Sequence, residues 1–94
     1  MRIADVGGRT LVLHFLHYEQ HGHKHTMCTI FDEEGERRIA IGIGVARCGK
    51  RDMFVKRVGR KIALQKALHD TPFTAHDRNH RARVWRAYFA VSRP

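Results

Sequence analysis

The sequence predicts a single α+β domain in which a three-stranded antiparallel meander is followed by two helices, in the order β-β-β-α-α. Three observations lead to this prediction. The first half of the chain alternates apolar and polar residues with the period of a strand, glycine-containing turns separate the alternating segments, and the second half repeats apolar residues at helical spacing. A chain of 94 residues can build one hydrophobic core but not two, so we expect residues 1–94 to form one domain.

The first two strands are predicted over residues 9–19 and 25–31, which alternate in period two. Between them, His21-Gly22 can supply the positive φ angles of a tight hairpin turn. A two-residue turn at these positions predicts a register in which Phe15 lies opposite Cys28 and Leu13 lies opposite Ile30.

This register leaves a second apolar face on the sheet, which carries Leu16, Tyr18, Met27 and Phe31. So many large apolar side chains are unfavourable in water. Either the last helix or another chain should cover this face, and a homodimer is therefore one of two expectations.

The third strand is predicted over residues 37–47, after a turn at 32–36 that contains a glycine. Its bulky residues share one face: Ile39, Ile41, Ile43 and Val45. Its small residues share the other: Ala40, Gly42, Gly44 and Ala46. We expect the bulky face to join the core and the small face to let another backbone come close.

Two helices are predicted, over residues 50–69 and 74–91, interrupted at 71–73. Asp52 suits the first turn of the first helix, and Thr74 with Asp77 resembles a weak capping box before the second. The apolar side of the first helix is predicted to hold Phe54, Val55, Val58, Ile62 and Leu68. That of the second is predicted to hold Val84, Trp85, Tyr88 and Phe89.

Positive charge is concentrated in the second half of the chain. Residues 1–46 hold five Lys/Arg and six Asp/Glu, whereas residues 47–94 hold thirteen Lys/Arg and three Asp/Glu. A basic segment of this density is typical of proteins that bind a polyanion, because each Lys or Arg beside a phosphate releases condensed counterions. We therefore expect a nucleic-acid or ribonucleoprotein partner, and the sequence does not distinguish DNA from RNA.

The candidate binding residues are the cations of the two predicted helices: Lys56, Arg57, Arg60, Lys61, Arg78, Arg81, Arg83 and Arg86. Those of the first helix form i,i+4 pairs whose repulsion an anionic partner would relieve, and those of the second are all arginine, whose planar fork matches phosphate. A solvated surface is the alternative interpretation. Trp85, Tyr88 and Phe89 lie among these arginines, where they either stack on bases or pack in the core.

Histidines crowd the first hairpin at positions 14, 17, 21, 23 and 25, and His76 and His80 are spaced as one turn of a helix. These are ligand spacings, but no Cys-x-x-Cys pair accompanies them, so we expect no metal or other cofactor. Cys28 and Cys48 are expected to be free thiols. Lys50 and Arg51 would favour a thiolate at Cys48, and a small buried residue is the alternative.

Catalytic constellations are sparse, and we expect no enzyme. Ser92 is the only serine, and four of the nine carboxylates lie in the turn at 32–36. A metal-dependent nuclease built on His76, Asp77 and His80 is the remaining enzymatic alternative. No apolar run is long enough to cross a bilayer and no secretory signal is visible, so a cytoplasmic protein without a membrane partner is expected.

Residues 42–67 carry a pattern built from seven positions: Ala46, Cys48, Asp52, Phe54, Gly59, Arg60 and Ala63. This pattern resembles segments of small uncharacterised bacteriophage and mobile-element proteins. The resemblance implies a phage setting inside a bacterial host cell, where small one-domain proteins often inhibit host defences, anti-CRISPR proteins among them. It implies a non-enzymatic inhibitor that occupies a nucleic-acid or guide-RNA channel of a defence complex. A stand-alone DNA- or RNA-binding regulator is the alternative.

The passage from the last strand through Cys48-Gly-Lys-Arg51 into a helix with Ala63 and Ala67 is also similar to double-stranded RNA-binding domains. That family has a helix before its strands, which this sequence lacks, and this chain adds a helix after them. The departure speaks against recognition of duplex RNA by shape.

Overall fold

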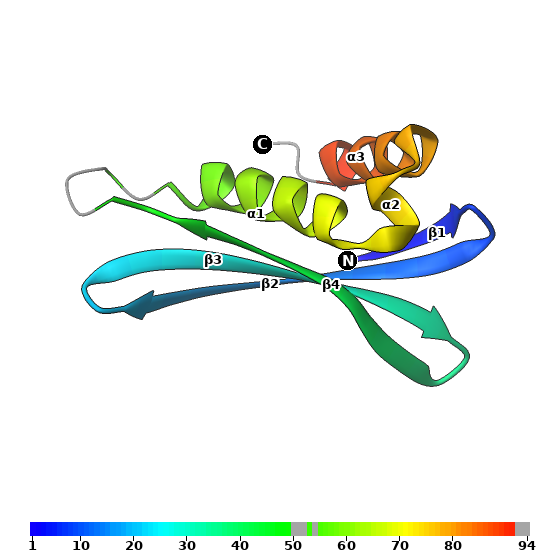
Figure 1. Ribbon diagram of the computed structural model, residues 1–94, viewed down its shortest axis with the longest axis horizontal. Helices are drawn as coiled ribbons and strands as arrows, with labels where there is room; N and C mark the ends of the chain where they lie inside the picture. Colours follow the sequence, from blue (N-terminus) through cyan, green and yellow to red (C-terminus); the bar gives the residue numbers. More distant parts are fainter. Residues whose placement is uncertain (50–52, 54, 92–94) are drawn as a thin grey trace.

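The computed structural model describes residues 1–49, 53 and 55–91 and shows an α+β fold: a four-stranded antiparallel sheet followed by helices. The elements are β1 (Arg2–Val6), β2 (Arg9–Gln20), β3 (His23–Glu34), β4 (Arg37–Arg47), α1 (Lys56–Asp70), α2 (Pro72–Ala75) and α3 (Arg78–Val91). The strands lie in the sheet in chain order. All the described helices, α3 included, lie on one face of the sheet (Figure 1). The expectation that the last helix covers the face of Leu16 and Met27 is therefore wrong.

The predicted hairpin and its register are confirmed. His21 and Gly22 have φ angles of 52° and 75°, so both occupy the left-handed region that a two-residue hairpin turn requires. Phe15 pairs with Cys28, and Leu13 pairs with Ile30.

The prediction of three strands is wrong by one, because β1 pairs with β2 at the edge of the sheet. Ile3 and Val6 are both buried, but they are three residues apart because a bulge separates them and gives Asp5 a φ of 56°. A bulge removes the period-two pattern by which a strand is recognised in a sequence.

The prediction that the bulky face of β4 joins the core is also wrong. Ile43 is 48% exposed, whereas Gly42 and Gly44 are buried beneath α1. A bulge at Ile41 shifts the pairing with β3, so Ile39 no longer shares a face with Ile43. The other half of the prediction is confirmed, since the small face admits another backbone.

Gly42 and Gly44 are buried because α1 lies very close to β4. A Cβ atom on Gly44 would overlap the backbone of α1 at Ala63 and Ala67, and one on Gly42 would overlap the side chain of Thr71. Glycine on the strand and alanine on the helix therefore set the distance between the two layers.

The buried side of α1 also differs from the side that the sequence predicts. Val55, Val58 and Ile62 are 40–47% exposed, and the buried residues of α1 are Ala63, Leu64, Ala67 and Leu68. Only Leu68 was assigned correctly among the described residues. The helix begins at Lys56, so the predicted start near Lys50 and the roles of Asp52 and Phe54 lie outside the described residues.

The second predicted helix begins at Arg78 and not at Thr74, because the short helix α2 precedes it. Asp77 Oδ1 accepts a hydrogen bond from the backbone N–H of His80 at 3.0 Å, which caps α3 and holds the pKa of that carboxyl below its usual range. Thr74 Oγ1 instead donates to the carbonyl of Leu68 at 2.6 Å. Val84 and Tyr88 are buried as predicted, while Phe89 is 49% exposed.

The chain contains no described helix before its first strand, which agrees with the departure from the double-stranded RNA-binding pattern. No helix in the described ranges is long and apolar enough to cross a membrane.

Candidate nucleic-acid interface

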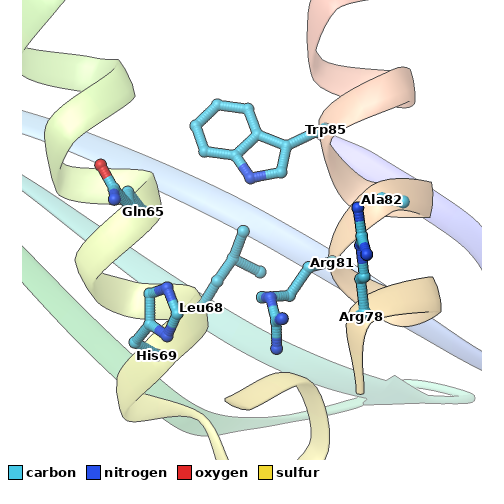
Figure 2. Close-up of a pocket in the computed structure, with 7 residues that line it drawn as sticks. All are labelled: Gln65, Leu68, His69, Arg78, Arg81, Ala82 and Trp85. Atoms are coloured by element: carbon cyan, nitrogen blue, oxygen red, sulfur yellow. The ribbon is translucent and has the colours of Figure 1, made fainter. Parts of the chain in front are cut away.

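A groove of about 430 Å³ lies between α1 and α3, and we call it the interhelical groove. Figure 2 shows its lining residues, which are Gln65, Leu68 and His69 from α1 and Arg78, Arg81, Ala82 and Trp85 from α3. A volume of this size falls in the range of sites that hold one small molecule or one nucleotide.

Local packing explains why a groove forms here. The helices α1 and α3 flank the groove, and Ala82 on α3 contributes a small side chain to its lining (Figure 2). Leu68 is fully buried below. The Trp85 indole closes one end, and it is fixed by stacking on Phe89 at 5.5 Å and by an edge contact with Tyr88 at 5.8 Å between ring centroids.

The groove is cationic. Two guanidinium groups and one imidazole line it, and none of its lining residues is a carboxylate. Arg81 is held in place because its Nη1 donates to the carbonyls of Thr74 and Ala75 at 2.8 and 2.7 Å. Arg78 forms no hydrogen bond or ion pair with any residue that the structure describes, so its donors remain available to an anion.

A second cationic cluster lies at the start of α1, where the helix crosses the end of β2. Lys56 lines a hollow of about 220 Å³ with His17, Tyr18, Glu19 and Lys24. Nδ1 of His17 lies 2.8 Å from Thr26 Oγ1. Burial, and then the charges of Lys56 and Arg60, hold the pKa of His17 below its ordinary value of 6.5.

The eight cations predicted from the sequence do not all face one direction. Arg78 and Arg81 line the interhelical groove. Lys61 does not line it, and its Nζ lies 5.5 Å from the centroid of the Phe89 ring, which stacks on Trp85. Lys56 and Arg60 lie beside His17. Arg83 turns away, because its Nη2 donates to the carbonyl of Ala4 on β1 at 2.8 Å.

Arg57 and Arg86 are exposed on α1 and α3. The structure therefore brings two of the predicted cations, Arg78 and Arg81, into the groove, and Lys61 lies beside the aromatic pair of Phe89 and Trp85.

Sequence reasoning missed three lining residues: Gln65, His69 and Ala82. Gln65 and His69 follow Lys61 at spacings of four residues, so they form one row along α1. That row was readable in the sequence, but which neighbour it faces was not.

The pair His76 and His80, whose spacing is that of one helical turn, does not lie on one helix. His76 lies in the turn after α2 while His80 lies on α3, so the two are not an i,i+4 pair on one helix. Nδ1 of His80 lies 3.0 Å from the carbonyl oxygen of Phe73, and its ring stacks on that of Phe73 at 4.3 Å. Within the described ranges, no three His, Cys, Asp or Glu side chains cluster in a way that could hold a metal ion.

No disulfide joins Cys28 and Cys48. Cys28 is fully buried in the core, and burial raises the pKa of its thiol to about 12. Cys48 is half-buried at the end of β4, with Sγ 3.6 Å from the carbonyl oxygen of Gly49.

Comparison of this chain with protein-family models, with curated proteins and with solved structures finds no significant match. The interhelical groove and the charges around it are therefore interpreted on their own chemistry.

Proposed function

We propose that this protein binds nucleic acid, or the nucleic-acid component of a ribonucleoprotein, through its helical layer, with the interhelical groove as the anchor. One observation carries the proposal: two arginines and a histidine meet an indole in a groove that no carboxylate lines. This combination suits a phosphodiester with an unpaired base beside it, because guanidinium groups bind phosphate and an aromatic ring stacks on a base of any identity.

The surroundings of the groove favour the same class of ligand. Residues 55–91, which include all the helices, hold nine Lys/Arg and two Asp. Of these two carboxylates, Asp70 accepts a hydrogen bond from the backbone N–H of Ile43 at 2.9 Å, and Asp77 caps α3. Both are thus engaged within the protein, and the positive field of the helical layer attracts a polyanion to the groove.

The proposed role is non-enzymatic inhibition of a nucleic-acid-targeting defence complex of a bacterial host. The choice of a bacterial defence complex as the target rests on the resemblance of residues 42–67 to phage proteins. A stand-alone regulator that binds bare DNA or RNA is the second candidate, and it is favoured by the aromatic end of the groove, which can hold an unpaired base without any protein partner.

Trp85 provides a direct test, because it is the only tryptophan of the chain and lines the groove. Addition of single-stranded oligonucleotides should change its fluorescence in parallel with binding measured by anisotropy of a labelled strand. Binding that leaves Trp85 fluorescence unchanged would exclude the groove as the anchor.

Two arginine variants separate a groove contact from a general charge effect. Arg78→Gln should weaken binding and lower the slope of log affinity against log salt by about 0.7–0.9, the value for one lost phosphate contact. Arg37→Gln changes the net charge equally, but Arg37 lies at the β3–β4 turn and should leave the salt slope unchanged. Equal losses of affinity in Arg78→Gln and Arg37→Gln would show that binding depends only on the net charge of the protein.

The two candidate roles differ in their preferred partner. A regulator should bind bare strands tightly at moderate salt, and Arg78→Gln should abolish regulation. An inhibitor should bind bare strands weakly, bind an assembled defence complex tightly, and lose that binding when the guide RNA is removed. Absence of any binding to nucleic acid or ribonucleoprotein would contradict both.

A further inference from the structure

The two ends of the interhelical groove differ in chemistry. His69 lies in the last turn of α1 and Arg78 lies in the first turn of α3, so both lie at the end where residues 71–77 join the two helices. Trp85 lies at the other end (Figure 2). We call these the cationic end and the aromatic end of the groove.

The chain itself closes the cationic end. The short helix α2 contacts both α1 and α3 there. Nη1 of Arg81 donates to the carbonyls of Thr74 and Ala75 on α2 at 2.8 and 2.7 Å, so this guanidinium ties α3 to α2. A linear ligand that enters the groove from the aromatic end meets this connection before it can pass beyond the two helices.

The donors at the cationic end suit a terminal phosphate better than an internal one. Arg78 forms no hydrogen bond or ion pair in the described part of the chain. The hydrogen bonds of Arg81 to described residues use Nη1 alone, which leaves its Nε and Nη2 for a ligand. An internal phosphodiester presents one charge and two terminal oxygens, whereas a phosphomonoester presents three oxygens and a charge of about −1.5 to −2 at pH 7.

No lining residue of the groove is a carboxylate that would compete for these donors. The two carboxylates that flank the connection between the helices are engaged elsewhere. Asp70 accepts from the backbone N–H of Ile43 on β4, and Asp77 accepts from the backbone N–H of His80. The positive charge at the cationic end is therefore left for a ligand.

The aromatic end continues into a second ring. Phe89 is 49% exposed and stacks on Trp85 with an interplanar angle of 22°. Nζ of Lys61 lies 5.5 Å from the centroid of the Phe89 ring. Bases of any identity stack on aromatic surfaces of this kind, and a neighbouring cation contacts the backbone that follows.

We infer that the interhelical groove holds the phosphorylated end of a single strand. The terminal phosphomonoester lies at the cationic end, and the bases that follow it stack toward the aromatic end. This inference rests on the proposed nucleic-acid function and adds to it the part of the strand that the protein binds. A free nucleotide carries the same phosphate group, but it would leave Phe89 and Lys61 unused, so the groove favours a strand end.

Oligonucleotides of one sequence, each labelled on an internal base, test the inference by fluorescence anisotropy. One strand carries a 5′ phosphate, one a 3′ phosphate and one hydroxyls at both ends, and one is closed into a circle. A phosphorylated strand should bind at least about tenfold more tightly than the hydroxyl-ended strand, the equivalent of one charge-assisted hydrogen bond. The circle, which has no end, should bind no better than the hydroxyl-ended strand.

Two variants separate contact with the terminal phosphate from the effect of its extra charge. Arg78 is exposed, so Arg78→Gln should leave the fold intact and remove most of the preference for the phosphorylated strand. Lys61→Gln removes the same charge near the aromatic end. It should weaken the binding of every strand by a similar factor and leave the preference unchanged.

The possible failures are distinguishable. A circle that binds as tightly as the phosphorylated strands would overturn the inference and leave the nucleic-acid proposal intact. So would a preference for phosphorylated ends that Arg78→Gln does not reduce. Binding of adenosine 5′-monophosphate as tightly as of the strands would overturn it in favour of a free nucleotide. Absence of binding to any strand or ribonucleoprotein would contradict the proposed function and this inference together.

Discussion

Neighbouring residues of β4 point into two different environments. Gly42 and Gly44 lie beneath α1 with no room for a Cβ atom, whereas Ile43 and Val45 extend over a face that no helix covers. One face of the sheet is thus packed by close approach of backbones, and the other, which we call the bare face, carries large side chains that no described helix covers.

The comparison shows that hydrophobic bulk and burial need not coincide on one strand. On the helical side, small residues let α1 come near enough for Leu64 and Leu68 to fill the core. On the bare face, large side chains stay partly in solvent, as Leu16 at 44% and Ile43 at 48% exposure show. Charge differs between the faces as well, since the cationic helices α1 and α3 lie on the packed side.

The largest expected effect is on the packed side, at Gly44. Gly44→Ala places a Cβ atom into the backbone of α1, which cannot move aside as a flexible side chain would. We expect the free energy of unfolding to fall by about 3 kcal/mol, at the upper end of typical overpacking costs. Urea denaturation at a fixed protein concentration measures the change.

Ala40→Val is the control, because Ala40 pairs with Phe31 on the bare face and is exposed. Its effect should stay within about 0.5 kcal/mol. A loss below about 1 kcal/mol for Gly44→Ala would show that the helix and the sheet are not locked at this distance.

A smaller effect, of opposite sign, is expected at Tyr88. Its hydroxyl is buried and has no hydrogen-bond partner among the described residues. Tyr88→Phe keeps the ring contacts with Phe15 and Trp85 and removes an unsatisfied polar atom. We expect the free energy of unfolding to rise by about 1 kcal/mol, measured by urea denaturation.

Tyr18→Phe makes the same chemical change on the bare face, where the ring stacks on His25 and is only half-buried. Its effect should lie within about 0.5 kcal/mol of zero. If Tyr88→Phe destabilises the protein by more than Tyr18→Phe does, the Tyr88 hydroxyl has a partner after all.

The sequence predicted the hairpin and its register because both follow from local rules: His21-Gly22 tolerates positive φ, and period two assigns the faces of β2 and β3. It did not predict β1, whose bulge breaks that period. It assigned the faces of β4 and α1 wrongly, because large apolar side chains are expected in the core and several of them lie outside it in this protein. The distance between helix and sheet is a tertiary property that no local pattern records.

The candidate site was also only partly predictable from the sequence. Composition and helical spacing were enough to name Lys61, Arg78 and Arg81, since charge and periodicity are visible in the sequence. The position of Arg78 and Arg81 in the groove, and the hydrogen bond of Arg83 to β1, depend on how α3 packs against α2 and β1. The position of a helix against the rest of the protein depends on the packing of the whole core, which a local sequence pattern does not specify.

The last and smallest effect concerns His17, which lies on the packed side below the start of α1. Burial and the charges of Lys56 and Arg60 lower its pKa in the folded state from 6.5. The unfolded chain therefore binds a proton on His17 at a higher pH than the folded chain does. The contribution to stability is fully present above pH 6.5 and is lost as the pH falls from there toward the lower pKa of the folded state.

An anion bound at Lys56 and Arg60 would offset their charges and raise the pKa of His17, so by linkage such an anion binds more tightly as the pH falls through this window. Lys24 and Glu19 line the same hollow and contribute opposing charges to it. An NMR titration of the His17 ring should show a midpoint below 6.5 that rises in Lys56→Gln. Lys66→Gln, on the same helix but bonded to the carbonyl of Val45, should leave the midpoint unchanged. Equal shifts in both variants would mean that His17 senses the net charge of the protein and not the cluster above it.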